Sequence, residues 1–175
     1  MLKFGPSKRE VAMKKVLTLA ALAGLVLAVS AYGARSGSSG TNVQKQAALY
    51  QIDQIEKIWH KAASKKDLNL MMSIWAPNAT ATFPGKTVTG KADIRAVFAK
   101  AGPFQPQNHW ISDTPAYKIR TTVNGNKGTL YFECHYIDVD TGKVASTVGA
   151  DQQVQKLNGK WLITNMAASS VTLTP

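Results

Sequence analysis

Three polar residues in the second half of the chain have side chains suited to acid–base chemistry: His109, Asp113 and Asp151. A general acid or base that works near neutral pH is most simply a histidine. If His109 opens a β-strand, Asp113 shares its face, but four residues of strand separate the two by about 13 Å. That distance is too long for a hydrogen bond, so a partner for His109 must come from another element, with Asp151 and Asn165 as candidates. The alternative is a His109 that lies at a solvent-facing strand end.

The other two histidines predict no second site. His60 follows Trp59 on an expected helix and is predicted to be exposed, while His135 is expected with Glu133 on the outer face of a sheet. The three histidines and the carboxylates show no metal-ligand spacing, so we expect no metal site. The sequence also contains no phosphate-binding loop, dinucleotide fingerprint or nucleophile elbow, and no cofactor is expected.

Cys134 is the single cysteine of the chain and lies in an apolar stretch. No disulfide can form within the chain. Because a free cysteine among apolar residues behaves as a small hydrophobic side chain, we expect Cys134 to be buried and unreactive.

The N-terminal segment has the pattern of a secretory signal. Lys14 and Lys15 precede an uncharged, mainly apolar run over residues 16–34, followed by small residues and a Gly/Ser stretch. We therefore expect a signal peptide over residues 1–33, with Met13 as an alternative start, and cleavage between Ser30 and Ala34. The mature protein would be secreted or periplasmic. The alternative is an uncleaved membrane anchor formed by residues 16–34.

The charge balance excludes few partners by itself. The chain carries 21 basic and 10 acidic residues, a formal net charge of +11. Most of the lysines are scattered singly, which suits a solvated surface, and aromatic residues do not alternate with arginines in any expected strand. No nucleic-acid partner is expected, and a membrane partner only if the N-terminal segment is uncleaved.

The elements that must position the candidate residues fall into two groups. A flexible spacer over residues 34–44 is expected to lead into one domain over residues 45–175. Helical periodicity comes first, and after Pro106 the period changes to two. The expected helices cover residues 43–64, 68–75 and 91–101, with short strands over 79–83 and 86–90. Four long strands are expected over 109–120, 128–138, 144–157 and 160–173. Short turns between long strands imply an antiparallel meander, so the fold class is α+β, with three helices on one face of a curved sheet.

Several local patterns resemble one known family. The helix that ends in LysLysAspLeuAsn and the segments IleTrpAlaProAsnAlaThrAlaThrPhe, GlyLysAlaAspIleArgAlaValPhe and LeuAsnGlyLysTrpLeuIle resemble the SnoaL-like branch of the nuclear-transport-factor-2-like superfamily. The resemblance covers about residues 45 to 172. It implies a cone-shaped curved antiparallel sheet, a half-barrel, with three N-terminal helices packed on its concave face and a pocket inside. Members include ketosteroid isomerase, scytalone dehydratase, limonene epoxide hydrolase and polyketide cyclases, together with domains of no known chemistry.

The resemblance also tests one catalytic scheme. The general-base aspartate of ketosteroid isomerase would fall at Phe83, and its oxyanion-binding tyrosine near Trp59. Phenylalanine cannot accept a proton, so that scheme is not expected here. Trp59 can still donate one hydrogen bond through its indole N–H.

Ten residues are expected to line the pocket, because an apolar cavity with few polar groups is typical of small-molecule sites. They are Ile55, Trp59, Met72, Trp75, Phe83, Phe98, Tyr136, Trp161, Ile163 and Asn165. The same side chains would equally suit a filled core, and the sequence does not separate these interpretations.

Two functions therefore remain open. The first is a pocket that binds a small apolar or mixed-polarity molecule, with His-dependent acid–base chemistry of the isomerase, dehydratase or cyclase type. The second is a non-catalytic association module in which the outer sheet face, with Tyr131, Glu133, His135 and Ile137, docks a partner. A homodimer is expected in either case.

Overall fold

The structure is a computed structural model that describes residues 37–171. The predicted signal peptide over residues 1–33 and its cleavage site lie outside the described residues. From Lys45 onward the chain forms one compact unit, and this unit holds the cavity and the polar clusters discussed below.

Three α-helices precede or interrupt the first strands: α2 (Gly37–Lys65), α3 (Leu68–Met72) and α4 (Lys91–Phe98). Helix α2 begins at Gly37, earlier than the expected start at residue 43, so the predicted spacer is helical from Gly37 onward. A buried stripe along α2 includes Ile52, Ile55 and Trp59, at the spacing of one helical face. The side chain of Asp67 accepts a hydrogen bond from the backbone N–H of Leu70 at 2.9 Å, which caps the N-terminus of α3.

The prediction that the second helix reaches Trp75 was wrong. Helix α3 ends at Met72, and Trp75 begins strand β1 (Trp75–Phe83), opposite Ile163 of strand β7 (Lys160–Ser170). Pro77 lies within β1, where the pairing with β7 is irregular between Trp75 and Thr80. Proline has no N–H to donate to a ladder, and such an irregularity tolerates it.

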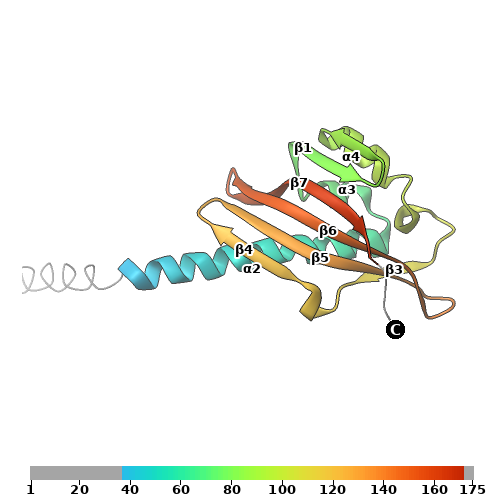
Figure 1. The fold of residues 1–175 in the computed structure, drawn as a ribbon, viewed down its shortest axis with the longest axis horizontal. Coiled ribbons are helices and arrows are strands. Elements are labelled where there is room, and N and C mark those ends of the chain that lie inside the picture. The colour runs from blue at the N-terminus through green and yellow to red at the C-terminus, as the bar shows by residue number, and fades with distance from the viewer. Residues whose placement is uncertain (1–36, 172–175) are drawn as a thin grey trace, which may run out of the picture. The chain divides into compact units, whose positions relative to one another are not determined.

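The remaining strands are β2 (Lys86–Thr89), β3 (Trp110–Asp113), β4 (Arg120–Asn124), β5 (Lys127–Asp138) and β6 (Lys143–Leu157). The sheet has the order β2-β1-β7-β6-β5-β3, and β4 also pairs with β5 (Figure 1). The pairing of β5, β6 and β7 is the predicted antiparallel meander. Strand β1 departs from it, because it pairs with β7 in the parallel direction.

The long strand predicted over residues 109–120 is divided. A short 3-10 helix, η2 (Ala116–Lys118), separates β3 from β4, and both strands pair with β5. The division follows Pro115, whose fixed φ and missing N–H interrupt a ladder. Thr114, in the segment between β3 and η2, lies against β5, where its hydroxyl donates to the backbone carbonyl of Glu133 at 2.8 Å.

The two faces of the sheet differ in what covers them. On β5, Leu130, Phe132, Cys134 and Tyr136 are buried on the face that packs against α2, and the rings of Trp59 and Phe132 are 5.5 Å apart. The α2 residues from Lys45 onward run across this face (Figure 1). The result is the expected α+β half-barrel: a curved, unclosed sheet with its helices on one face. Cys134 is buried, as predicted.

Candidate functional site

A cavity of about 270 Å³ lies inside the half-barrel, between α2, α4 and the inner face of the sheet. One side of the cavity is closed by the 3-10 helix η1 (Gly102–Phe104), which follows α4 and precedes η2 in the chain. The residues that line it are Trp59, Phe83, Phe98, Ala101, Gly102, Pro103, Phe104, Trp110, Tyr136, Ser146, Val148, Ala150, Met166 and Ala168. None of these side chains is charged at neutral pH, so the cavity presents a mainly aromatic and aliphatic wall.

Aromatic rings build most of that wall. Phe98 contacts the rings of Trp59, Phe83 and Phe104, with centroid distances of 5.2, 5.8 and 5.8 Å and near-perpendicular planes. Trp110 and Tyr136 are stacked, with centroids 6.2 Å apart and an interplanar angle of 29°. Edge-to-face and offset contacts of this kind hold rings in defined positions, so the wall is preorganised.

Tyr136 is a polar residue of the cavity wall whose hydroxyl has a shifted pKa. Burial raises the pKa of its hydroxyl well above the usual value of 10, and the nearby Trp59 side chain only partly opposes this. The phenol therefore stays protonated at physiological pH and can donate a hydrogen bond. The other polar atoms of the lining are the Ser146 hydroxyl and the indole nitrogens of Trp59 and Trp110. The Trp59 Nε1 is buried and has no hydrogen-bond partner in the described structure.

The rim at η1 is fixed by local contacts. The Asn108 side chain donates to the carbonyl of Gly102 at 2.9 Å, and Lys66 Nζ donates to the carbonyl of Asn108 at 2.6 Å. Gly102 packs so closely against Trp110 that an added Cβ would lie 2.7 Å from the indole ring. A side chain at this position would therefore force the Trp110 ring to move.

The predicted pocket lining is only partly that of the cavity. Trp59, Phe83, Phe98 and Tyr136 line it. Trp75 and Ile163 are fully buried core residues, and Met72 is also buried. Ile55 and Trp161 line a separate groove, and Asn165 lies in an open groove on the outer sheet face.

Sequence reasoning missed Phe104, Trp110 and Ser146 as lining residues. Strand alternation was the signal that could have found Trp110. Trp110 and Ser112 lie on one face of β3, whereas Asp113, and His109 just before the strand, lie on the other. The aromatic face was the better candidate for the inside.

His109 and Asp113 do share a face, as predicted, but this face points away from the cavity. The His109 side chain is 59% exposed, and its Nδ1 lies 2.8 Å from the carboxylate of Asp140. Ile111 and Asp113 are also exposed, whereas Trp110 and Ser112 are half-buried. Asp151 is exposed on the outer face of β6, opposite Tyr131 of β5. The structure therefore does not bring His109, Asp113 and Asp151 together at a cavity.

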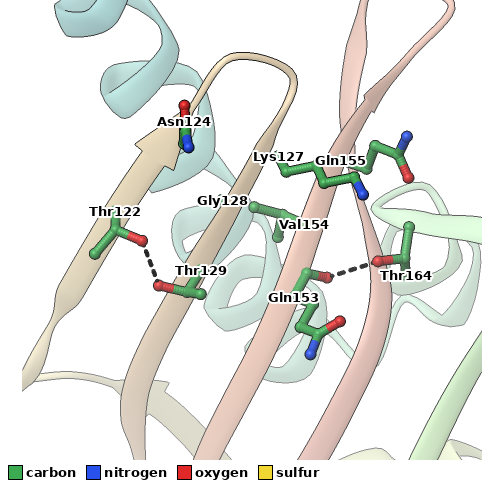
Figure 2. A pocket seen from close by; sticks show the side chains of 9 residues that line it. All are labelled: Thr122, Asn124, Lys127, Gly128, Thr129, Gln153, Val154, Gln155 and Thr164. Atoms are coloured by element: carbon green, nitrogen blue, oxygen red, sulfur yellow. Dashed lines mark hydrogen bonds between the residues drawn. The ribbon is translucent and has the colours of Figure 1, made fainter.

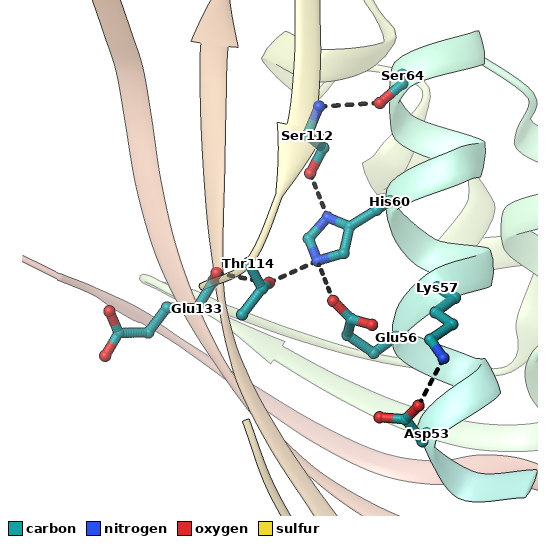
Figure 3. A network of polar contacts seen from close by, with 8 residues as sticks. All are labelled: Asp53, Glu56, Lys57, His60, Ser64, Ser112, Thr114 and Glu133. Carbon is teal, nitrogen blue, oxygen red and sulfur yellow. Dashed lines mark hydrogen bonds and ion pairs between the residues drawn. The ribbon is translucent and has the colours of Figure 1, made fainter. Parts of the chain in front are cut away.

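The prediction that His60 is exposed was wrong, because its side chain is buried among polar partners (Figure 3). Its Nδ1 lies 2.6 Å from Ser112 Oγ, and its Nε2 lies 2.6 Å from Thr114 Oγ1 and 3.0 Å from Glu56 Oε1. Thr114 Oγ1 donates its own proton to the backbone carbonyl of Glu133, so it accepts from His60. Nε2 therefore carries a proton.

The His60 cluster connects α2 to the segment that leaves β3. The backbone N–H of Ser112 also donates to Ser64 Oγ at 2.9 Å, which adds a second link between the same elements (Figure 3). His60 and Glu56 are not among the residues that line the cavity. The cluster is therefore a buried polar connection between helix and sheet.

The outer face carries a second buried carboxylate, Glu133. Burial acts to raise its pKa, but the hydrogen bonds from Lys118 and Tyr131 and the Lys118 charge outweigh burial, so the pKa lies below its usual value. Lys118 Nζ and Tyr131 Oη lie 3.1 and 3.0 Å from Glu133 Oε1. Glu133 is therefore on the outer face, as predicted, but it is covered rather than open to a partner.

Next to this cluster the outer face is polar and open. Figure 2 shows a groove across β4 to β7 in which the hydroxyls of Thr122 and Thr129 lie 2.7 Å apart and Thr164 donates to the carbonyl of Gln153. Its amide and hydroxyl side chains hold no titratable pair suited to acid–base chemistry.

Within residues 37–171, no group of three or more His, Cys, Asp or Glu side chains is arranged to hold a metal ion. In that range, no helix is both long and apolar enough to cross a membrane.

The fold is that of the NTF2-like proteins. The structure is similar to an NTF2-like protein of unknown function from Pseudomonas putida, with a TM-score of 0.63 and 13% identity over 74% of this chain and 98% of that one. It is also similar to a proposed dehydratase of the NTF2-like family from Streptomyces avermitilis, with a TM-score of 0.60 and 13% identity over 73% of this chain and 99% of that one.

A third similar structure is a proposed calcium/calmodulin-dependent protein kinase type II association domain from Thiobacillus denitrificans. Its TM-score is 0.58, with 15% identity over 69% of this chain and 94% of that one. The SnoaL-like domain family matches residues 56–161, and the chain belongs to that family. No curated protein matches the chain.

Proposed function

We propose that this SnoaL-like domain binds a small, uncharged and mainly apolar molecule in the inner cavity, with the Tyr136 hydroxyl as hydrogen-bond donor. The observation that carries the proposal is the cavity itself: about 270 Å³, walled by aromatic and aliphatic side chains. Concave sites of this character, with a few polar groups that orient the ligand, are typical of small-molecule binding.

The uncharged, mainly apolar wall of the cavity favours a neutral ligand. An ion would lose its hydration without meeting an opposite charge, so a neutral molecule is favoured. Because burial keeps Tyr136 protonated, its partner is an acceptor such as a carbonyl or ether oxygen. Flat ligands fit best between the stacked Trp110–Tyr136 pair and the Phe98 cluster.

Binding without acid–base catalysis is the version that this geometry supports. Tyr136 is the titratable residue in the lining, and a phenol with a raised pKa is a poor base at neutral pH. His109, the histidine proposed for isomerase, dehydratase or cyclase chemistry, is exposed and paired with Asp140. The likeness to a proposed dehydratase concerns the fold and adds no catalytic residue to this cavity.

The decisive experiment is native mass spectrometry of the purified full chain, followed by binding measurements with any molecule that co-purifies. Tyr136→Phe should weaken its binding by about tenfold, because one hydrogen bond to a buried donor is lost while the ring remains. Tyr117→Phe is the matched control, since Tyr117 is 80% exposed. If Tyr136→Phe binds as tightly as the control variant, the ligand does not occupy the cavity as described.

Export remains part of the proposal. The basic pair and apolar run before Arg35 support a cleaved signal and a secreted or periplasmic protein. N-terminal sequencing of the mature protein should return a first residue from Ala31 to Ala34. Recovery of Met1 or Met13 would refute cleavage and support the membrane-anchored alternative.

An association surface is the second candidate function, and one observation favours it. Ile111 of β3 lies opposite Ile137 of β5, and Ile137 lies opposite Val144 of β6, which makes an aliphatic strip across three strands. Ile111 and Val144 are 46% and 42% exposed. A homodimer that covers this strip would be detected by light scattering, and Ile111→Lys should then shift the mass to that of a monomer. A wild-type protein that is monomeric at high concentration would remove this candidate.

A further inference from the structure

The outer face of the sheet carries a row of uncharged polar side chains that crosses four neighbouring strands. Thr122 of β4 lies opposite Thr129 of β5, which lies opposite Gln153 of β6. Gln153 in turn lies opposite Asn165 of β7. All four residues are exposed. The row therefore presents hydroxyl and amide groups to solvent at the spacing of neighbouring strands, about 4.8 Å.

Two adjoining hollows, of about 370 and 510 Å³, follow this row on the outer face. Thr122, Thr129 and Gln153 line both of them, so the two hollows form one continuous groove, the outer groove. Figure 2 shows these three side chains on neighbouring strands at the surface. Asn165 lines the larger hollow. The whole row is therefore accessible to a molecule that lies in the outer groove.

The amides in the middle of the row are free to bind such a molecule. Within residues 37–171, the side chains of Gln153 and Asn165 form no hydrogen bond with another residue. An amide group both donates and accepts hydrogen bonds, and so does a hydroxyl. A hydroxyl of a ligand matches both capacities, whereas an ammonium group only donates and a carboxylate only accepts. The row therefore favours a ligand rich in hydroxyl groups.

One side of the outer groove adds charged groups of both signs. The guanidinium of Arg120 lies 4.0 Å from the centroid of the Tyr131 ring, and Asp151 lies opposite Tyr131 on the next strand. Arg120 and Asp151 are exposed, and in the described part of the chain neither forms an ion pair. A carboxylate accepts and a guanidinium donates two hydrogen bonds side by side, an arrangement suited to adjacent hydroxyls. Lys127, on the other side, leaves the groove with a small positive excess.

We propose that the outer groove binds an extended, neutral oligosaccharide that lies across strands β4 to β7. Its hydroxyls recur at about the length of one sugar ring, which is close to the roughly 4.8 Å between strands, so successive rings meet successive members of the row. Arg120 and Asp151 bind hydroxyls along one side of the chain. This site lies on the opposite face of the sheet from the inner cavity and does not depend on the function proposed for that cavity.

The test uses cellohexaose, an extended and uncharged chain of glucose units, as the probe. In the full chain labelled with ¹⁵N, the side-chain amides of Gln153 and Asn165 report the outer groove, and the indoles of Trp59 and Trp110 report the inner cavity. Cellohexaose should shift the two amide signals saturably. Cellobiose spans fewer strands and should bind about tenfold more weakly, because it loses several hydrogen bonds.

Three outcomes would each overturn the proposal. They are amide signals that do not move, shifts confined to the two indoles, and cellobiose binding as tight as that of cellohexaose. An anionic chain of galacturonate units and a cationic chain of glucosamine units test the charge preference. Tighter binding of either than of cellohexaose would also contradict a site for neutral sugars.

Two variants test the row itself by calorimetry. Gln153→Ala and Asn165→Ala should each weaken cellohexaose binding about fivefold to tenfold, since each removes a group that both donates and accepts. Both side chains are exposed, so the melting temperature should stay close to that of the wild type. Gln107→Ala, at an exposed loop residue, is the matched control and should bind as the wild type does.

Unchanged affinity in both row variants would overturn the assignment of the row. Because Tyr136 lines the inner cavity, Tyr136→Phe should leave cellohexaose binding intact. The outer-groove proposal and the cavity proposal therefore fail independently.

Discussion

His60 Nδ1 of helix α2 lies 2.6 Å from the hydroxyl oxygen of Ser112 on strand β3, although 52 residues separate them in the sequence. The other ring nitrogen is shared between Glu56 and Thr114. The His60 imidazole therefore connects helix α2 to strand β3, which borders the cavity. His109, three residues from Ser112, has no such role.

His60→Ala should lower the free energy of unfolding by roughly 3 kcal/mol, because it leaves the buried Glu56 carboxylate without its partner. Denaturant unfolding of wild type and variant measures the difference. His109→Ala, in an exposed pair, is the control and should stay within about 0.5 kcal/mol of wild type. Equal losses in the two variants would contradict the assignment of His60 as the structural histidine.

Glu133→Gln should destabilise the protein at pH 7 by roughly 1–2 kcal/mol, since it removes the carboxylate that Lys118 and Tyr131 contact. The pKa of Glu133 is lower in the folded protein than in the unfolded chain. Its contribution is therefore fully present above the unfolded-state pKa and is lost as the pH falls through the folded-state pKa.

The stability gap between wild type and Glu133→Gln should accordingly close as the pH falls below about 4. Unfolding curves from pH 7 to pH 3 measure it. Asp53→Asn, in an exposed pair with Lys57, is the control and should change stability by less than about 0.5 kcal/mol at pH 7. A gap that stayed constant down to pH 3 would show that Glu133 is not charged in the folded protein.

Cys134 should be inert toward thiol reagents in the native protein. Burial raises the pKa of its thiol to about 12, so almost no thiolate is present at pH 8, and the sulfur is also inaccessible. Kinetics with a chromogenic disulfide reagent should follow the rate of global unfolding and accelerate with denaturant. Fast labelling without denaturant would show that β5 opens locally.

Gly102→Ala should disturb the rim of the cavity, because the new Cβ would lie 2.7 Å from the Trp110 ring. We expect a loss of about 1–3 kcal/mol in stability and a change in tryptophan fluorescence as Trp110 moves. In a Trp110→Phe background the same substitution should cost less, because the smaller ring leaves space. A full cost in both backgrounds would mean that the strain arises from the backbone of η1 and not from Trp110.

Local patterns in the sequence were sufficient for much of the fold. The apolar stripe of α2, the Asp67 cap and the alternation of β5, β6 and β7 all follow from interactions between near neighbours. The apolar stretch around Cys134 predicted its burial. Such features can be predicted because a periodic pattern shows that one face of a helix or strand is buried, without showing which element packs against it.

The tertiary structure decided what periodicity leaves open. Alternation puts His109 and Asp113 on one face of β3 and Trp110 and Ser112 on the other, but only the pairing of β3 with β5 and the packing of α2 select the inner face. The burial of His60 depends on its contacts with Ser112 and Thr114. Ser112 is held by its pairing with β5 and its bond to Ser64, and Thr114 is held by its bond to the carbonyl of Glu133 on β5. Such contacts join residues far apart in sequence, so neither their spacing nor their residue types carry the signal locally. For that reason the residue pattern predicted an α+β fold with a curved sheet, and the resemblance to SnoaL-like domains implied a half-barrel with a pocket. The three-dimensional arrangement determined which aromatic rings and which hydroxyls line the cavity, and which histidine is buried.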